Sequence, residues 1–231
     1  MKNYYIKLEE KEIIEKEKTN AEIQYLKAQV HPHFLFNTLN NIYSFALNKS
    51  PLAGSLVMKL YDTLTYMIND CKADLVPLEK ELKMIENYIG LEKVRYGDRL
   101  EMQLEITGDY KNKLIAPLLL IPFVENSFKH GSSKMLKHPW IKLCISIKEN
   151  ELYMNLSNSR PLQVSSVNSR NGIGLKNVQK RLQLLYSGKY ELLLQPTDDE
   201  FSVHLQIPLE PIASMEKAKQ LTQTSQILNY A

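Results

Sequence analysis

The apolar residues of the first third of the chain recur at the three- and four-residue spacing of amphipathic helices. This spacing predicts one helix over residues 30–47 and a second over residues 52–71, joined by a short connection that ends in Pro51. The apolar positions on one side of the first helix are Leu35, Leu39, Ile42 and Ala46. Each helix is too apolar to stand alone, so two copies of the resulting hairpin are expected to pair as a four-helix bundle.

Residues 1–30 carry sparser apolar positions within a stretch rich in Glu and Lys. Ile6 and Ile13 are seven residues apart, and so are Ile23 and Val30. Seven-residue spacing predicts a short, imperfect parallel coiled coil that acts as a dimerising stalk. An exposed helix with occasional apolar residues is the alternative interpretation.

From about residue 76 the pattern changes from wholly helical to mixed, which places a domain boundary near residue 75. The predicted order is a helix (76–96), a strand (100–106), a helix (118–130), two strands (140–147 and 151–157), a loop (158–171), a helix (175–185) and two strands (190–194 and 201–207). This order predicts a mixed sheet with helices on one face, an α/β sandwich over residues 76–208, and so an α+β chain overall. The polar residues 209–231 are predicted to form a disordered tail.

Composition narrows the possible classes of protein. The chain has 231 residues, of which 44% are hydrophobic and 24% charged, as in a globular protein of one or two domains. A net charge of +3 without a basic block argues against nucleic acid as a partner. Cys71 and Cys144 show no pairing motif, which favours a reducing compartment. No apolar run approaches the length of a membrane-spanning helix.

One histidine of the first helix lies in an unusual setting. His33 is on a narrow polar strip, opposite the apolar side of the helix. Pro32 directly precedes it, so the helix kinks or restarts there and the surface around His33 is opened. A partly exposed histidine without catalytic work is the more common situation, and the residue types alone leave both interpretations open.

Two clusters in the second domain have the chemistry of a nucleotide site. Asn126, Lys129 and His130 share one face of a helix and offer an amide oxygen for Mg²⁺ beside a cation for phosphate. They could equally form a solvated face. Gly172 and Gly174 open the next helix, where bare N–H groups can face an anion. The absence of a third glycine and of a G-K-[ST] motif sets aside the dinucleotide-binding fold and the P-loop.

The stretch Q-V-H-P-H-F-L-F-N-T-L-N at residues 29–40 closely resembles the phosphoacceptor box of the LytS/YehU-type sensor histidine kinases, which reads close to Q-x-N-P-H-F-L-F-N-x-L-N. His33 corresponds to the histidine that takes the phosphate. The two later clusters resemble, in order, the N box and the second glycine box of the GHKL ATP-binding domain. That domain is shared by histidine kinases, the Hsp90 chaperone, type II topoisomerases and MutL.

The resemblance implies a role for each cluster residue. Asn126 would bind Mg²⁺, Lys129 and His130 would lie near the phosphates of ATP, and the phosphate side would be lined by Gly172, Gly174 and Leu175. Where the family offers an aspartate to the adenine amino group, this chain could offer Asn158 or Ser157, and a neutral amide or hydroxyl gives a weaker bond than a carboxylate. Phe34 follows His33 where many histidine kinases have an acid, so Glu125 is the candidate base.

The resemblance implies a homodimeric two-component sensor histidine kinase. It would autophosphorylate His33 from MgATP and pass the phosphoryl group to an aspartate of a response-regulator receiver domain. The chain would then be the cytoplasmic part of an inner-membrane sensor whose spanning segment lies upstream. Two alternatives remain: a degenerate kinase that binds nucleotide or a partner as a scaffold, and a GHKL ATPase in which Glu125 activates water.

Overall fold

The computed structural model describes residues 32–131, 138–160 and 173–213. Its first part is a hairpin of two helices, α2 (Pro32–Leu47) and α3 (Leu52–Asn69), followed by the short 3₁₀ helix η1 (Asp70–Lys72). The backbone turns at Lys49, whose φ is positive at 52°. The predicted helical hairpin is therefore present. The predicted coiled-coil stalk over residues 1–30 lies outside the described residues.

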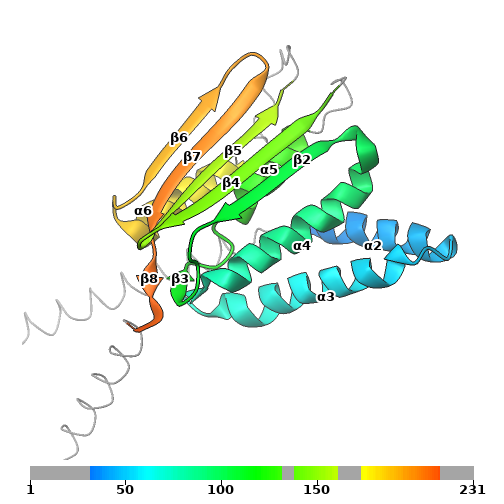
Figure 1. Cartoon of the computed structure of the whole chain (residues 1–231), viewed down its shortest axis with the longest axis horizontal. Helices are drawn as coiled ribbons and strands as arrows, with labels where there is room; N and C mark the ends of the chain where they lie inside the picture. Colours follow the sequence, from blue (N-terminus) through cyan, green and yellow to red (C-terminus); the bar gives the residue numbers. More distant parts are fainter. Residues whose placement is uncertain (1–31, 132–137, 161–172, 214–231) are drawn as a thin grey trace, which may run out of the picture.

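The hairpin packs against the third long helix, α4 (Leu78–Tyr96), which separates it from the sheet (Figure 1). The buried face of α3 consists of Leu56, Leu60, Thr63 and Tyr66. Acidic residues in the first turn of α4 and basic residues in its last turn suit the helix dipole. Gly97 ends the helix with a φ of 57°, which side-chain-bearing residues rarely adopt.

A five-stranded sheet forms the second layer, with the strand order β2-β4-β5-β7-β6. Its strands are β2 (Glu101–Thr107), β4 (Trp140–Lys148), β5 (Glu151–Ser159), β6 (Glu191–Pro196) and β7 (Glu200–Pro208). β2 and β4 run parallel and every other pair is antiparallel. The sheet packs on α4, α5 (Ile121–Gly131) and α6 (Ile173–Tyr186), which all cover one face (Figure 1). The α+β class, with an α/β sandwich, is confirmed.

A second, small sheet was not predicted. It has the order β1-β3-β8, formed by β1 (Val76–Pro77), β3 (Lys113–Ile115) and β8 (Glu210–Pro211). Residues 76 and 77 are therefore strand and not the start of α4. The first residues of the predicted disordered tail belong to the fold, because Leu209 is buried and Glu210 pairs with Leu114. Strands of two or three residues are too short to show alternation in the sequence.

Three further boundaries differ from the predicted ones around the candidate site. α5 begins at Ile121 and not at residue 118, because residues 118–120 form a turn in which Leu118 has a φ of 54°. β5 continues through Asn158 and Ser159, which were expected in a loop but pair with β7. α6 begins at Ile173, so Gly174 lies within its first turn. Within the described ranges, no helix has the length and apolar character needed to cross a membrane.

Candidate active site

The helix α5 carries the predicted N-box residues, and its apolar face fixes their orientation. Val124 and Phe128 are buried in the core. The ring of Phe128 meets two tyrosine rings of α4, edge-on with Tyr88 at 5.9 Å between centroids and stacked with Tyr96 at 6.1 Å. These contacts hold α5 against the last turns of α4, so the polar side chains of both helices face a common space.

That space is a pocket of about 430 Å³ at the junction of α2, α4 and α5. Its polar and charged lining residues are Asn37 from α2, Glu92 and Arg95 from α4, and Glu125 and Lys129 from α5. The predicted base and one predicted phosphate contact therefore line the same pocket. Asn37 lies four residues after His33, one turn further along α2. The side chain of His33 itself lies outside what the structure describes.

The acidic and basic groups of the pocket influence one another. Nη1 of Arg95 donates to Oε2 of Glu92 at 3.5 Å, and its guanidinium lies over the Tyr96 ring at 5.2 Å from the centroid. Burial raises the pKa of Glu92, and the negative charge of Glu125 adds to the rise, whereas Arg95 opposes it. The pocket therefore combines two carboxyl groups and two cations, which suits an anion that carries a metal ion.

Asn126 and His130 lie on a neighbouring side of α5, and both are half-buried. Neither is among the residues that line the 430 Å³ pocket, whereas Lys129 is. Desolvation lowers the pKa of His130, and the positive charges of Lys129 and Arg160 lower it further. These surroundings favour the neutral form of the His130 imidazole.

Asn158 is buried at the end of β5, against the last residue of α5. A Cβ placed on Gly131 would lie 2.7 Å from the Asn158 Cβ, so only glycine fits there. Nδ2 of Asn158 donates to the carbonyl oxygen of Ser159 at 2.9 Å, whereas the buried Oδ1 has no hydrogen-bond partner among the described residues. Such an oxygen is costly to leave unpaired, and the adenine amino group is the kind of donor that would satisfy it. The residues present therefore fit a nucleotide.

The start of α6 supplies the predicted second glycine box in part. Gly174 is exposed, and a Cβ there would meet no atom within 4 Å, so its surroundings are open. Leu175 is half-buried and packs against the core. α6 contacts α5, which brings the two predicted clusters to one side of the sandwich. Gly172 lies outside the described residues.

A buried polar network that the sequence analysis missed fixes the turn before α5. Glu81 of α4 has no exposed surface and accepts hydrogen bonds from three consecutive backbone N–H groups. The donors are Leu118 at 2.9 Å, Leu119 at 3.0 Å and Leu120 at 3.3 Å. Arg181 of α6 donates to the carbonyl oxygens of Pro117 at 2.7 Å and Leu118 at 2.8 Å. These bonds hold Leu118 in its left-handed conformation.

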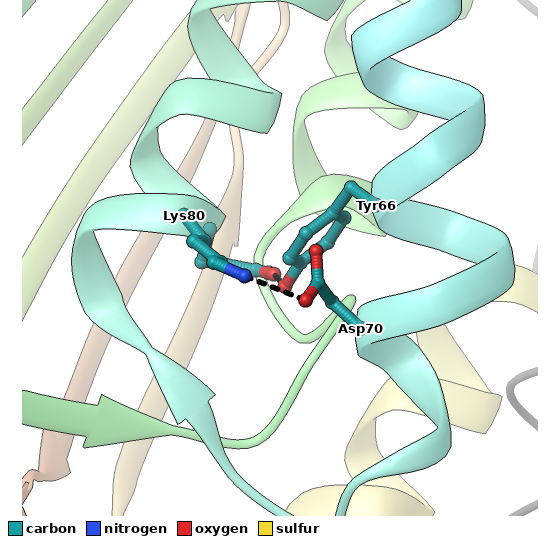
Figure 2. A network of polar contacts seen from close by, with 4 residues as sticks. Tyr66, Asp70 and Lys80 are labelled. Atoms are coloured by element: carbon teal, nitrogen blue, oxygen red, sulfur yellow. Dashed lines mark hydrogen bonds and ion pairs between the residues drawn. The ribbon is translucent and has the colours of Figure 1, made fainter.

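The same carboxylate connects the sandwich to the helical hairpin. The hydroxyl of Tyr66 on α3 donates to Oε2 of Glu81. Beside it, Nζ of Lys80 pairs with Oδ1 of Asp70 at 2.7 Å (Figure 2). This network could have been suspected from the sequence, because Glu81 lies among the apolar positions on the inward face of the predicted helix. Its presence was explained instead by the preference for acidic residues in the first turn of a helix.

The described residues thus combine a helical hairpin, packed on an α/β sandwich, with a buried amide oxygen that suits an adenine amino group. Residues 21–100 match the model of the family described as histidine kinase. The sensor protein LytS of Staphylococcus haemolyticus is 30% identical over 204 residues, which are 84% of this chain and 35% of that protein. The sensor histidine kinase BtsS of Escherichia coli is 29% identical over 82% of this chain and 34% of its own length.

Among solved structures, the histidine kinase domain of a blue-light activated histidine kinase from Erythrobacter litoralis aligns with a TM-score of 0.45 and 15% identity, covering 83% of this chain and 95% of that one. The resemblance to the LytS-type sensor histidine kinases is confirmed by the family match and the curated relatives. The chain spans about a third of the length of these curated relatives.

Proposed function

We propose that this chain is the kinase core of a two-component sensor, which transfers the γ-phosphoryl group of ATP to His33. The observation that carries the proposal is the pocket at the junction of α2, α4 and α5. It joins Asn37, one turn after His33, to Glu125 and Lys129 of the N-box helix. A phosphoacceptor helix and a nucleotide-binding helix that share one pocket are what such a transfer requires.

The proposed step is an in-line displacement. A ring nitrogen of neutral His33 attacks the γ-phosphorus, the bond from that phosphorus to the β,γ-bridging oxygen breaks, and ADP leaves. The imidazolium formed on phosphorylation then gives up its remaining N–H proton, for which the Glu125 carboxylate is the proposed acceptor. An imidazole of ordinary pKa is mostly neutral at cellular pH, so no special activation of His33 is needed.

Nucleotide binding is proposed for the side of the sandwich where α5, β5 and α6 meet. Asn158 Oδ1 would accept from the adenine amino group, and Lys129 with the N–H groups at Gly174 and Leu175 would face the phosphates. His130, in its neutral form, would donate or accept a hydrogen bond there without adding charge. Mg²⁺, held by Asn126 and the phosphates, would neutralise charge on the nucleotide.

The proposed assembly is a homodimer formed through the hairpin. The face of α2 and α3 that points away from α4 exposes large apolar side chains, among them Leu39, Tyr43, Leu47 and Tyr61 at 48–65%. Exposed apolar area of this kind marks a protein interface. The proposed partner for phosphoryl transfer is the receiver-domain aspartate of a response regulator. The proposed location is the cytoplasm, as part of a sensor held at the inner membrane.

The test is to incubate the chain with Mg²⁺ and γ-labelled ATP and to measure protein-bound label that is stable in base and lost in acid. We expect the wild-type chain to be labelled and His33→Gln to lose the label completely. His31→Gln is the matched control, because it removes the other imidazole of the same box and should label normally. ATP binding without label would replace the proposal by the degenerate kinase that Asn158 suggests. Steady phosphate release without label would identify an ATPase.

A further inference from the structure

Arg95 has no role in the resemblance described above, yet its surroundings are those of an anion-binding residue. It lies in the last turn of α4 and lines the 430 Å³ pocket together with Glu125 and Lys129. The pocket also includes Asn37, so Arg95 shares it with residues of both the phosphoacceptor helix and the N-box helix. A cation in this position faces the path that a phosphoryl group would take from one helix to the other.

The guanidinium of Arg95 is held on two sides. Glu92 accepts a hydrogen bond from Nη1 at 3.5 Å, and the Tyr96 ring lies 5.2 Å from the guanidinium carbon. Tyr96 in turn stacks on Phe128 of α5 at 6.1 Å. The position of Arg95 is therefore tied to the helix that carries Glu125 and Lys129. With 36% of its side chain exposed, the Arg95 guanidinium is oriented by these contacts and remains accessible to an anion.

We propose that Arg95 binds the equatorial oxygens of the phosphoryl group while it passes from ATP to His33. The inference rests on the proposed function and adds to it a residue that stabilises the transition state. A guanidinium has five N–H donors, of which the bond to Glu92 uses one, and its planar fork matches phosphoryl oxygens. Arg95 forms no covalent bond and exchanges no proton in the step; it neutralises charge on the group in transit.

Two substitutions separate this role from simple structural support. Arg95→Gln removes the charge and the fork, and Arg95→Lys keeps the charge alone. We expect Arg95→Gln to slow single-turnover labelling of His33 about 100-fold, with the dissociation constant of a fluorescent ATP analogue changed by less than about threefold. Arg95→Lys should recover part of the rate. Arg99→Gln is the control, because Arg99 also lies over the Tyr96 ring, at 5.9 Å, but does not line the pocket.

The outcomes distinguish this inference from the proposed function. If the wild-type chain forms no phosphohistidine, both fail together. If it does and Arg95→Gln labels at the same rate, this inference alone is wrong. It is also wrong if Arg95→Gln weakens nucleotide binding as much as it slows labelling, because Arg95 then binds the ground state. Should Arg95→Gln fail to fold, Arg95→Lys decides: a slower rate with normal nucleotide binding supports the inference, and an unchanged rate overturns it.

Discussion

The two regions of this chain complete their cores in different ways. The sandwich encloses its own core: side chains with no exposed surface come from α4, the turn before α5, and the sheet, including Ile85, Leu119, Leu120, Leu143 and Leu152. The hairpin buries one side of α3 on α4 and leaves large apolar side chains on its opposite face in contact with solvent. The sandwich is therefore a complete unit, whereas the hairpin needs a further surface.

The polar contacts within the sandwich also differ in burial from those that join it to the hairpin. Inside the sandwich, Glu81 and Arg181 bind the backbone of residues 117–120 and are both almost fully buried. Between the regions, the polar contacts include the Tyr66 hydroxyl on Glu81 and the partly exposed ion pair of Lys80 with Asp70. Exposed ion pairs contribute little to stability. The sandwich thus fixes the turn before α5 by buried hydrogen bonds, whereas the ion pair of Lys80 with Asp70 between the regions is partly open to solvent.

The largest effect is expected from removing the carboxylate that both regions share. Glu81→Ala leaves three buried N–H groups without an acceptor, so we expect the free energy of unfolding to fall by about 3–5 kcal/mol. Urea denaturation followed by circular dichroism measures it. Glu79→Ala, at an exposed position two residues earlier, is the control and should stay within about 0.5 kcal/mol of wild type. A loss below about 1 kcal/mol for Glu81→Ala would show that the turn before α5 holds without this carboxylate.

A smaller effect, confined to assembly, is expected from the open face of the hairpin. Combining Tyr43→Glu with Leu47→Glu places charges on this face, where the two side chains are each 65% exposed. We expect the dimer to weaken by about 100-fold or more, about 2.8 kcal/mol, in light scattering across a concentration series. Stability of the sandwich should be unchanged. Leu193→Glu is the control, because Leu193 is similarly exposed at 45% but lies on β6, far from the hairpin. An unweakened dimer would mean that another surface joins the two copies.

The parts of the fold that the sequence predicted well are those with long, regular patterns. The helices of the hairpin and the five strands of the main sheet repeat their apolar spacing over many residues, and tertiary contacts only shift their ends. The failures lie where one distant contact decides the conformation. Residues 118–120 were predicted as part of a helix because all three are leucines. In the structure, their N–H groups donate to the Glu81 carboxylate, and the segment forms a turn instead. The two-residue strands β1 and β8 exist only because β3 lies between them.

The residues of the candidate site also fall into those that local motifs predicted and those that only tertiary packing brings into place. Asn126, Lys129 and Asn158 were identifiable because short motifs carry them. Arg95 and Glu92 were not, because they enter the pocket through the packing of α4 on α5, which is set by ring contacts between residues more than thirty positions apart. In a sequence, such residues can be recognised as charged residues at the inward positions of an amphipathic helix, as Glu81 and Glu92 are in α4. A charge at such a position indicates a buried polar contact or a site.

The smallest expected effect is the pH dependence of folding stability that arises from the ionisation of Glu92. The direction of this pH dependence follows from the burial of the carboxyl group. Desolvation and the charge of Glu125 raise the pKa of Glu92 in the folded chain above its ordinary value of 4.5, although Arg95 opposes the rise. Between the two pKa values the folded state binds more protons than the unfolded state, so this group's contribution to stability is present at low pH and is lost as the pH rises through the raised pKa. The glutamine of Glu92→Gln does not ionise, so this variant does not lose stability in this way as the pH rises.

Glu92→Gln should therefore be more stable than the wild-type chain at pH 8, and the advantage should shrink toward pH 4. The amide oxygen can still accept the hydrogen bond from Arg95, so the pocket keeps its geometry. Thermal unfolding of both proteins over this pH range measures the difference. Glu86→Gln, on the exposed side of the same helix, is the control for the loss of one negative charge. If Glu92→Gln were instead less stable than the wild-type chain at pH 8, with the deficit vanishing toward pH 4, the ion pair with Arg95 would outweigh desolvation, and Glu92 would be an anchor for Arg95 that needs its charge.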